Sequence, residues 1–465
     1  MCVCTKIIGF TLKKQLFYKN IFIVFLLNLF DTTLKLNGFP IKEAKALLKT
    51  IQSKNDAEFS AYIQDKKQEI VAYHLEHNSF YKSFVREVDV SNWNAIPVMT
   101  KRNLQQPLEQ RLSDGFTKSN IYVNKTSGSS GDPFVFAKDK FSHALTWAII
   151  QNRFGWYDLN FNSSKQARFY GIPLDVRGYY KERFKDVLSK RFRFSVFDLS
   201  DEAFTEHLKK FETTAFNYIN GYTSSIVQFA KFLQKKNTVL KDYCPTLKAC
   251  IVTSEMLFDD GKLLMETQFG IPVINEYGAS ELDLIAFQNL ENNWQLNSET
   301  LFVEILDEFD NPVPKGQEGR VVITSLYNKA HPFIRYDIGD IGIISESSTQ
   351  KKPVLKKLIG RTNDLAILPS GKKAAGLTFY YITKSIIEDD GSVKEFVIEQ
   401  LTKELFNIKY ASKGALSDKK EMLIKKEMEN YLESGLDITF ERLDALQRNR
   451  SGKLKQFTSY IKHDS

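Results

Sequence analysis

A chain of 465 residues with 43% hydrophobic and 26% charged residues is long enough for two or three domains with large cores, and this composition excludes a disordered protein. Its 64 basic and 56 acidic residues give a net charge of +8, but they are interspersed and form no basic stripe between aromatic residues. This pattern excludes a nucleic-acid-binding groove and favours a small anionic ligand.

The cysteines form neither a disulfide framework nor a metal-ligand pattern with a histidine. There are four of them, Cys2, Cys4, Cys244 and Cys250, and the six histidines are scattered. The sequence therefore predicts a reducing, cytoplasmic setting without a structural metal.

An apolar segment, FIVFLLNLF at residues 22–30, lies near the N-terminus. A membrane-spanning helix needs about 20 apolar residues, so this segment is too short for one, and no small-residue cleavage site follows it. Three interpretations stay open: a helix on the body, an extension outside the enzyme proper, and a segment that associates with a membrane. Residues 1–36 are accordingly treated as an N-terminal extension that catalysis does not need.

The chain from residue 40 to about residue 112 has apolar residues at helical spacing, and residues 122–360 then alternate between strand-like and helix-like runs. Predicted strands lie at 167–173 and 247–255, and predicted helices lie at 224–236 and 259–270. Residues 301–326 predict a β-hairpin with a Pro- and Gly-rich turn. Such alternation is typical of a layered α/β domain.

The pattern changes after Gly360. Strands are predicted at 394–400, 404–412 and 436–444, and an amphipathic helix is predicted at 418–434. Residues 447–457 have the composition of a solvated tail. The predicted fold class is thus α/β, with a large multi-layer domain at 37–360 and a small mobile α+β domain at 361–465.

A hydroxyl- and glycine-rich stretch, TSGSSGDP, occupies residues 126–133 between two strand-like runs. Glycines allow backbone amides and hydroxyls to surround a phosphate, but Ser-Gly clusters are also common in ordinary hairpin turns. The G-x-x-x-x-G-K-[ST] phosphate loop does not fit because Asp132 and Pro133 follow Gly131. A P-loop NTPase is therefore not expected, and the choice between a hairpin turn and a phosphate loop depends on the rest of the chain.

Four more short motifs follow in a definite order: NEYGASELD at 275–283, RYDIGDIG at 335–342, GRTNDLAILPSGKK at 360–373 and NRSGKLKQF at 449–457. Together with TSGSSGDP, they resemble the ATP- and AMP-binding motifs of the adenylate-forming superfamily. Within it, the chain is most similar to the phenylacetate-CoA ligase family, including its polysaccharide-cluster (CapK-like) branch. The resemblance covers residues 40–465.

The resemblance implies a ligase with two half-reactions. A carboxylate first attacks ATP to give acyl-AMP and pyrophosphate, with Mg²⁺ as the metal cofactor. A thiol, usually that of coenzyme A, then displaces AMP after the C-terminal domain has rotated. The implied partners are a small-molecule carboxylic acid, ATP and a thiol acceptor. A carrier protein or an amine as acceptor, membrane association and a homodimer stay open, and nucleic acid is not expected.

The resemblance implies a role for each site residue. The phosphate loop is matched by Thr126, Ser127, Gly128, Ser129, Ser130 and Gly131. Tyr277 is expected to pack on adenine, and the backbone of Gly278, Ala279 and Ser280 is expected to line the α-phosphate. Glu281 is expected to hold Mg²⁺, since a hard cation prefers carboxylate oxygens.

Three further roles come from the later motifs. Asp340 is expected to accept hydrogen bonds from the ribose, Arg361 to lie near the ribose and α-phosphate, and Lys453 to reach the α-phosphate in the adenylating pose. Lys453 is preferred to Lys455 because it follows Ser451 and Gly452 directly. At the hinge, Asn363 stands where the family pattern has its first Asp, although Asp364 remains.

The acyl substrate is not readable from the sequence. The resemblance places the acyl pocket around Tyr222, Thr253, Ser254 and Ala279, and no charged residue among them indicates a particular acid. The alternatives are an acyl-protein synthetase that uses Cys244 or Cys250, an adenylating enzyme of surface polysaccharide or lipid biosynthesis, and a nucleotide-binding protein without turnover.

Overall fold

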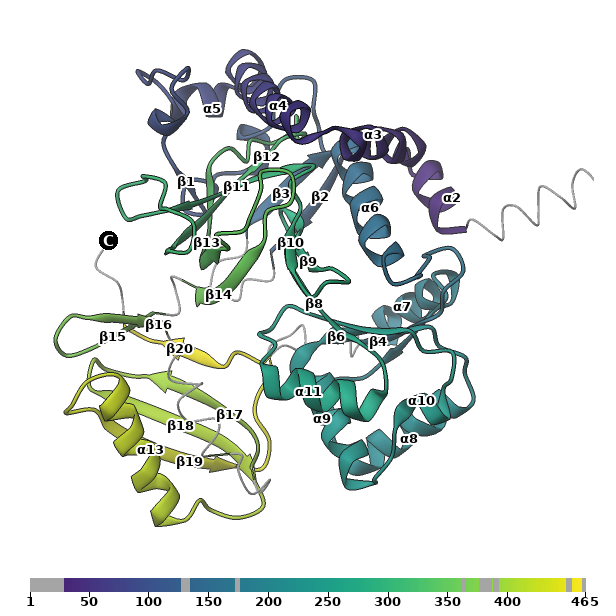
Figure 1. Cartoon of the computed structure of the whole chain (residues 1–465), viewed down its shortest axis with the longest axis vertical. Coiled ribbons are helices and arrows are strands. Elements are labelled where there is room, and N and C mark those ends of the chain that lie inside the picture. The colour runs from purple at the N-terminus through teal and green to yellow at the C-terminus, as the bar shows by residue number, and fades with distance from the viewer. Residues whose placement is uncertain are drawn as a thin grey trace, which may run out of the picture.

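The computed structural model describes residues 29–126, 134–171, 176–361, 365–375, 387, 393–448 and 454–461 (Figure 1). Three sheets of four or more strands dominate it, and helices cover them, so the predicted α/β class is confirmed. No helix within the described ranges is long and apolar enough to cross a membrane.

The largest sheet has seven strands in the order β10-β9-β8-β7-β6-β4-β5, and its strands from β5 to β8 are parallel. Its strands are β4 (Gln166–Phe169), β5 (Arg191–Phe194), β6 (Tyr218–Tyr222), β7 (Ala249–Thr253), β8 (Val273–Ala279), β9 (Asp283–Gln288) and β10 (Trp294–Leu296). Every residue of β6 and β7 is buried, as expected for central strands of a parallel sheet with both faces covered.

Helices cover both faces of this sheet. The helices of this part of the chain are α2 (Leu29–Leu36), α3 (Ile41–Ser53), α6 (Lys140–Gly155), α7 (Val176–Leu188), α8 (Asp201–Glu212), α9 (Thr223–Lys235), α10 (Leu240–Tyr243) and α11 (Asp259–Phe269). On one face, α8, α9 and α11 pack in a core rich in phenylalanine. On the other face, α6 and α3 pack against Ile251 and Ile274.

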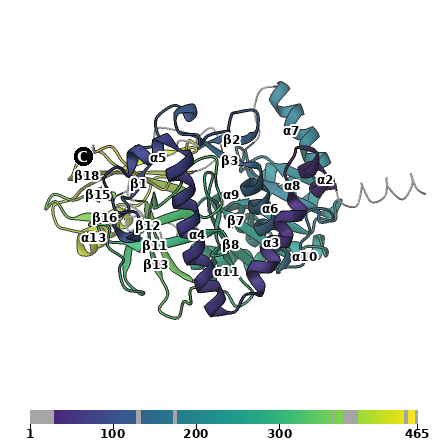
Figure 2. The same cartoon turned by 90° about the horizontal axis from the view of Figure 1, so that it is seen from above.

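A five-stranded sheet forms the second layer. Its strands are β1 (Met99–Thr100), β11 (Leu301–Leu306), β12 (Glu318–Ser325), β13 (Tyr336–Ile344) and β14 (Leu355–Arg361). Around it lie α4 (Asp56–His77), α5 (Ser79–Phe84) and the short 3₁₀ helices η1 (Trp93–Ala95) and η2 (Leu108–Gln110). Seen from above, α4 runs along the junction of the two large sheets (Figure 2), and it begins with a capping box between Asn55 and Glu58.

The C-terminal part has its own core around Phe396, Ile408 and Ile424. It consists of the pair β15 (Leu365–Ile367) and β16 (Lys373–Ala375), α13 (Asp418–Tyr431), and a sheet of β17 (Val393–Gln400), β18 (Leu405–Ser412), β19 (Asp437–Leu443) and β20 (Phe457–Ser459). This sheet lies beside α9 and α11 (Figure 1), where the Gln228 side chain donates to the Lys394 carbonyl at 2.6 Å.

The predicted strands and helices are confirmed from residue 167 onwards, including the antiparallel β11–β12 and β17–β18 pairs. Two predictions were wrong. The N-terminal α-helices end at Phe84 rather than near residue 112, because 3₁₀ turns and the short β1 follow. The expected tail contains β20, which pairs in parallel with β17.

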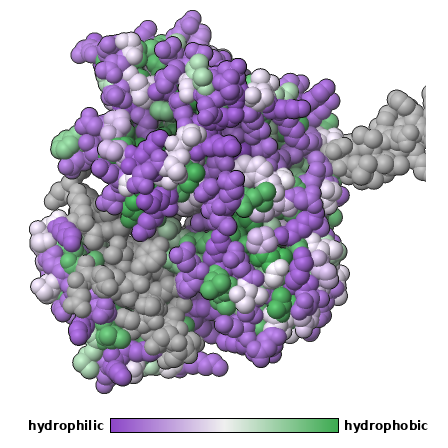
Figure 3. Space-filling model, in the orientation of Figure 1, coloured by the Kyte–Doolittle hydropathy of each residue, from purple (hydrophilic) through white to green (hydrophobic). Residues whose placement is uncertain are grey.

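The N-terminal boundary also differs from the expectation. Helix α2 packs on the body, since Phe30 lies 5.0 Å from Trp147 and 5.1 Å from Phe161 between ring centroids, and Leu34 is buried. These contacts move the start of the body back to Leu29. The face of the molecule seen in Figure 3 is largely hydrophilic, with hydrophobic residues in small separate patches.

Candidate active site

The NEYGASE motif lies where the seven-stranded sheet changes from parallel to antiparallel. Strand β8 is parallel to β7 on one side and antiparallel to β9 on the other. A β-carbon on Gly278 would lie 2.6 Å from the Asp283 carbonyl oxygen, so glycine is required there by the backbone itself. Ala279 is half-buried and Ser280 is exposed at the open side of this corner.

The structure brings the predicted adenine and ribose residues together. The Tyr277 hydroxyl donates to the Asp340 carboxylate at 2.5 Å, and both side chains are buried. Asp340 lies on β13 directly opposite Arg361 on β14, although the Arg361 side chain lies outside the described part of the structure. Three residues from three separate motifs therefore meet at one place.

Glu281, the predicted metal ligand, is buried beside Tyr336 of the RYDIGD motif. The Tyr336 hydroxyl donates to Glu281 Oε1 at 3.0 Å, and burial followed by the nearby Glu281 charge raises the pKa of Tyr336. The carboxylate keeps lone pairs that Tyr336 does not use, so Glu281 fits a cation shared with phosphate oxygens. In the described ranges no group of three or more His, Cys, Asp or Glu side chains could hold a metal alone.

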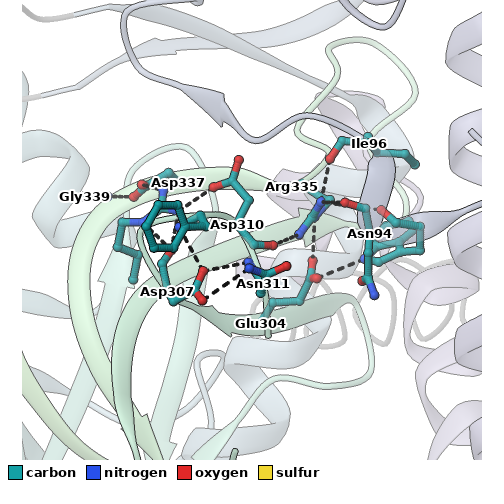
Figure 4. A network of polar contacts seen from close by, with 12 residues as sticks. Asn94, Ile96, Glu304, Asp307, Asp310, Asn311, Arg335, Asp337 and Gly339 are labelled. Atoms are coloured by element: carbon teal, nitrogen blue, oxygen red, sulfur yellow. Dashed lines mark hydrogen bonds and ion pairs between the residues drawn. The ribbon is translucent and has the colours of Figure 1, made fainter. Parts of the chain in front are cut away.

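Arg335 anchors the RYDIGD strand from within the core (Figure 4). Its fully buried guanidinium donates to the carbonyls of Asn94 at 3.0 Å, Ile96 at 2.5 Å and Asp310 at 3.1 Å. Its Nε lies 3.5 Å from the Glu304 carboxylate. Arg335 therefore has a structural role, although a charged residue within a nucleotide motif would be expected to bind ligand.

Asp337 holds the same strand from its other side. It accepts from the Gly339 backbone N–H at 2.8 Å (Figure 4). It also accepts from the Arg320 guanidinium at 2.8 Å. Gly339 has φ of +82°, a conformation that glycine adopts without strain. Arg335 and Asp337 together fix the strand that presents Tyr336 and Asp340 to β8.

Thr126 closes the base of the hairpin formed by β2 (Ile121–Lys125) and β3 (Val135–Asp139). Its N–H donates to the Phe134 carbonyl at 3.0 Å, and its hydroxyl accepts from the Phe134 N–H at 3.0 Å. The predicted loop residues Ser127, Gly128, Ser129, Ser130 and Gly131 lie outside the described residues. The hairpin and the phosphate-loop interpretations are compatible, because the loop connects the two paired strands.

Lys453, Asn363 and Asp364 also lie outside the described residues, but the residues around Lys453 are anchored. The Leu454 N–H donates to Glu255 Oε1 at 3.0 Å, and the Ser224 N–H donates to the other oxygen of Glu255 at 2.7 Å. Arg448 donates to the Ser224 hydroxyl at 3.0 Å. Both ends of residues 449–453 are thus held at the carboxyl ends of β6 and β7.

The predicted acyl-pocket residues lie at the same sheet edge, with a charged neighbour that the sequence analysis missed. Strand pairing places Tyr222, Thr253 and Glu276 side by side on β6, β7 and β8, and the Tyr170 ring after β4 lies 4.6 Å from the Tyr222 ring. We call these four residues the polar row. The alternation of side chains along a strand predicts that Glu276 and Tyr277 face opposite sides of the sheet. Only the pairing of β7 with β8 shows that Glu276 lies beside Thr253.

Three curated relatives match the chain in sequence, one CapK protein and two phenylacetate-coenzyme A ligases, whereas no protein-family model matches it. Protein CapK of Staphylococcus aureus is 23% identical over 314 residues, which are 64% of this chain and 66% of CapK. Phenylacetate-coenzyme A ligase of Pseudomonas putida is 28% identical over 130 residues, 26% of this chain and 29% of that enzyme. The chain thus spans just under two thirds of CapK and less than a third of the ligase.

Solved structures match over more of the chain. 2-Hydroxyisobutyryl-CoA ligase in the postadenylation state, in complex with R3-HIB-AMP, has a TM-score of 0.64 at 16% identity and covers 88% of this chain and 90% of its own. In the thioesterification state, the same enzyme has a TM-score of only 0.52 over 88% and 91% of the two chains. The amide bond synthetase McbA from Marinactinospora thermotolerans has a TM-score of 0.51 at 14% identity, over 72% and 68%.

The arrangement of this chain is thus nearer to the postadenylation state than to the thioesterification state. The resemblance inferred from five short motifs is confirmed by these matches. The chain is a homologue of CapK and of phenylacetate-coenzyme A ligase, and it has the fold of acyl-CoA ligases of the adenylate-forming superfamily.

Proposed function

We propose that this chain activates a carboxylic acid with ATP as acyl-AMP and then transfers the acyl group to a thiol, that of coenzyme A. The single observation that carries the proposal is the meeting of Tyr277, Asp340 and the backbone of Arg361, which come from three motifs far apart in the sequence. A chance match of short motifs gives no reason for these residues to converge on one corner of the fold.

In the proposed first half-reaction, nucleotide and acid bind at the carboxyl edge of the seven-stranded sheet. Asp340 accepts hydrogen bonds from the ribose, and Tyr277 orients the Asp340 carboxylate through its hydroxyl. Glu281 would hold Mg²⁺, which supplies positive charge to the phosphates of ATP. Lys453 would donate to the α-phosphate where negative charge develops, and the contact between Glu255 and Leu454 supports this role by keeping the neighbouring backbone at this edge.

In the proposed second half-reaction, the C-terminal part leaves this edge so that the thiol can reach the acyl-AMP. We place the hinge at Arg361, between residues 37–360 and residues 361–465. The separate core of the C-terminal part supports this boundary. A reaction that uses ATP and coenzyme A also fits a cytoplasmic location.

Pyrophosphate release with a panel of carboxylic acids, with and without coenzyme A, tests the proposal. Release that depends on one class of acid, followed by thioester formation only when coenzyme A is present, is the expected result. Release without thioester would point to a carrier protein or an amine as acceptor. ATP binding without release, whichever acid is supplied, would instead indicate a nucleotide-binding protein.

An acyl-protein synthetase that uses its own cysteine is a weaker candidate. Cys250 is fully buried in β7, and burial raises the pKa of its thiol. Cys244 is also buried, and its thiol donates to the carbonyls of Thr214 at 3.4 Å and Phe216 at 3.6 Å. Neither thiol is placed to receive an acyl group.

A further inference from the structure

An arginine with a buried Nε atom lies next to the polar row. Arg168 is on β4, directly opposite Asn220 of β6, and its guanidinium stacks on the Tyr170 ring at 4.0 Å from the ring centroid. Burial lowers the pKa of Arg168, and its Nε is buried without a hydrogen-bond partner among the described residues. No ion pair joins Arg168 to any residue in the described ranges.

Arg168 differs in its lack of an acidic partner from other arginines of the described core. Arg153 pairs with Glu299 at 2.6 Å and Arg193 with Asp186 at 3.1 Å, although the Nε of Arg193 also lacks a hydrogen-bond partner. A buried donor without a partner costs about 1–3 kcal/mol, and more when it is charged. The pairing that Arg168 lacks within the described chain can be supplied by a ligand.

Glu276 supplies the opposite charge at the other end of the polar row. Its side chain accepts a hydrogen bond from Thr253, and burial raises its pKa to about 7 although the Arg168 charge opposes this shift. Arg168, Tyr170 and Glu276 each keep some access to solvent. Glu276 also lies two residues before Gly278 of the proposed α-phosphate site, so the polar row adjoins that site.

We infer that Arg168 and the polar row select a carboxylic acid whose tail carries a neutral hydrogen-bonding group, a hydroxyl or an amide, over acids with alkyl or aryl tails. This inference rests on the proposed adenylation, because the reacting carboxylate must lie near Gly278. The tail then extends along the polar row towards Arg168.

The charges decide among tails of similar size. An anionic tail would pair with Arg168 but would meet Glu276, and a cationic tail would pair with Glu276 but would meet Arg168. An alkyl or aryl tail would leave the buried Nε of Arg168 without an acceptor. A hydroxyl or amide can accept a hydrogen bond from Arg168 or donate one to Glu276, and it carries no charge that either residue would repel.

The test measures pyrophosphate release by the full-length chain with matched acids. Each alkyl acid is compared with analogues of the same length that carry a hydroxyl, an amide, an amine or a second carboxylate on the tail. The kcat/KM of the best hydroxyl or amide acid is expected to exceed that of its alkyl match by about 10²-fold or more. A site whose polar groups hydrogen-bond the substrate discriminates strongly against an analogue that lacks the bonding group. The hydroxyl and amide arms identify which group is used.

Two variants connect this preference to the residues. Arg168→Met keeps the side-chain length without the charge and is expected to bring the polar-to-alkyl ratio close to one. Glu276→Gln is expected to lower the ratio less, because glutamine still accepts a hydrogen bond. Arg86→Met and Glu87→Gln are the matched controls, since these side chains are 81% and 84% exposed, and the ratio should not change in them. If Arg168→Met does not fold, Arg168→Lys takes its place and should lower the ratio by disrupting the stack on Tyr170.

A preference for alkyl, aryl or charged tails would overturn the inference while leaving the adenylation intact. A ratio that stays unchanged in both the Arg168 and Glu276 variants would also overturn it. Failure of every acid to release pyrophosphate would instead remove the proposed function, and the inference with it.

Discussion

The hydroxyl of Tyr277 on β8 donates to the carboxylate of Asp340 on β13 at 2.5 Å. This hydrogen bond joins the seven-stranded sheet to the five-stranded sheet, because each residue belongs to a different sheet. The relative position of the two sheets therefore fixes the distance between the groups proposed to bind adenine and ribose.

Tyr277→Phe removes this hydrogen bond and leaves the Asp340 carboxylate without the hydroxyl donor. Hydrogen bonds to charged groups contribute about 1.5–3 kcal/mol, so the Kd for ATP is expected to rise about tenfold or more. Isothermal titration calorimetry measures this change. Tyr460→Phe is the control, because Tyr460 is 60% exposed and distant from β8. Equal ATP affinity in wild type and Tyr277→Phe would exclude Tyr277 from the nucleotide site.

Lys453→Ala should slow only the adenylating half-reaction, by about 10² to 10³ in rate, as expected for one preorganised donor at a developing charge. The same variant should still transfer the acyl group from acyl-AMP that is supplied ready-made. Single-turnover measurements of each half-reaction check this, with Lys455→Ala as the neighbouring control. Equal loss in both half-reactions would contradict the proposed movement of the C-terminal part.

Glu255→Gln weakens the acceptor shared by the N–H groups of Ser224 and Leu454. Loss of the charge removes roughly half the strength of these hydrogen bonds, so adenylation is expected to slow about five- to tenfold while acyl transfer changes little. Glu291→Gln on an exposed loop is the matched control. A slower transfer step with unchanged adenylation would mean that Glu255 stabilises the arrangement of the C-terminal part that serves acyl transfer.

Much of the fold follows from local pattern. Continuous apolar runs such as residues 249–253 predict buried parallel strands, and the apolar spacing of residues 224–236 predicts α9. The active-site motifs are also recognisable, because glycines and charged residues stand at fixed spacing. Gly278 illustrates the reason, since a side chain there would collide with the Asp283 carbonyl.

The roles of charged residues depend on contacts that local pattern does not contain. Arg335 belongs to a nucleotide motif, yet its partners are backbone carbonyls at residues 94, 96 and 310. The residues around Arg168 have the pattern of an ordinary buried strand. Only the pairing of β4 with β6 shows that Arg168 lies beside Asn220. Long-range pairing therefore decides which charges are structural and which face a ligand.

Glu276 should make stability depend on pH. Its pKa is raised from the usual 4.5 to about 7 in the folded protein, so its contribution to stability is fully present below about pH 4.5 and is lost as pH rises through about 7. The shift corresponds to at most about 3 kcal/mol. Denaturant titrations at about pH 5.5 and about pH 8.5 should show Glu276→Gln gaining more stability relative to wild type at the higher pH. An equal difference at both pH values would contradict the raised pKa.

Helix α2 should contribute to stability, whereas the residues before it should not. A chain starting at Asn37 loses the buried Leu34 and the contacts of Phe30 with Trp147 and Phe161, and its free energy of unfolding should fall by about 2–5 kcal/mol. A chain starting at Leu29 should match the full-length protein. Thermal melting of the three proteins compares them, and equal Tm values for the two shortened chains would show that α2 packs without stabilising the body.

The polar row has a consequence for the evolution of this chain. Tyr222 and Thr253 end β6 and β7, Tyr170 lies just beyond β4, and Glu276 lies within β8. The backbone groups of these strands are occupied by pairing with one another. Exchanging Thr253 or Glu276 therefore alters the surface offered to a substrate without altering the sheet that carries it. Substrate specificity can therefore change one substitution at a time, and related proteins can come to use different acids while they keep the same sheet.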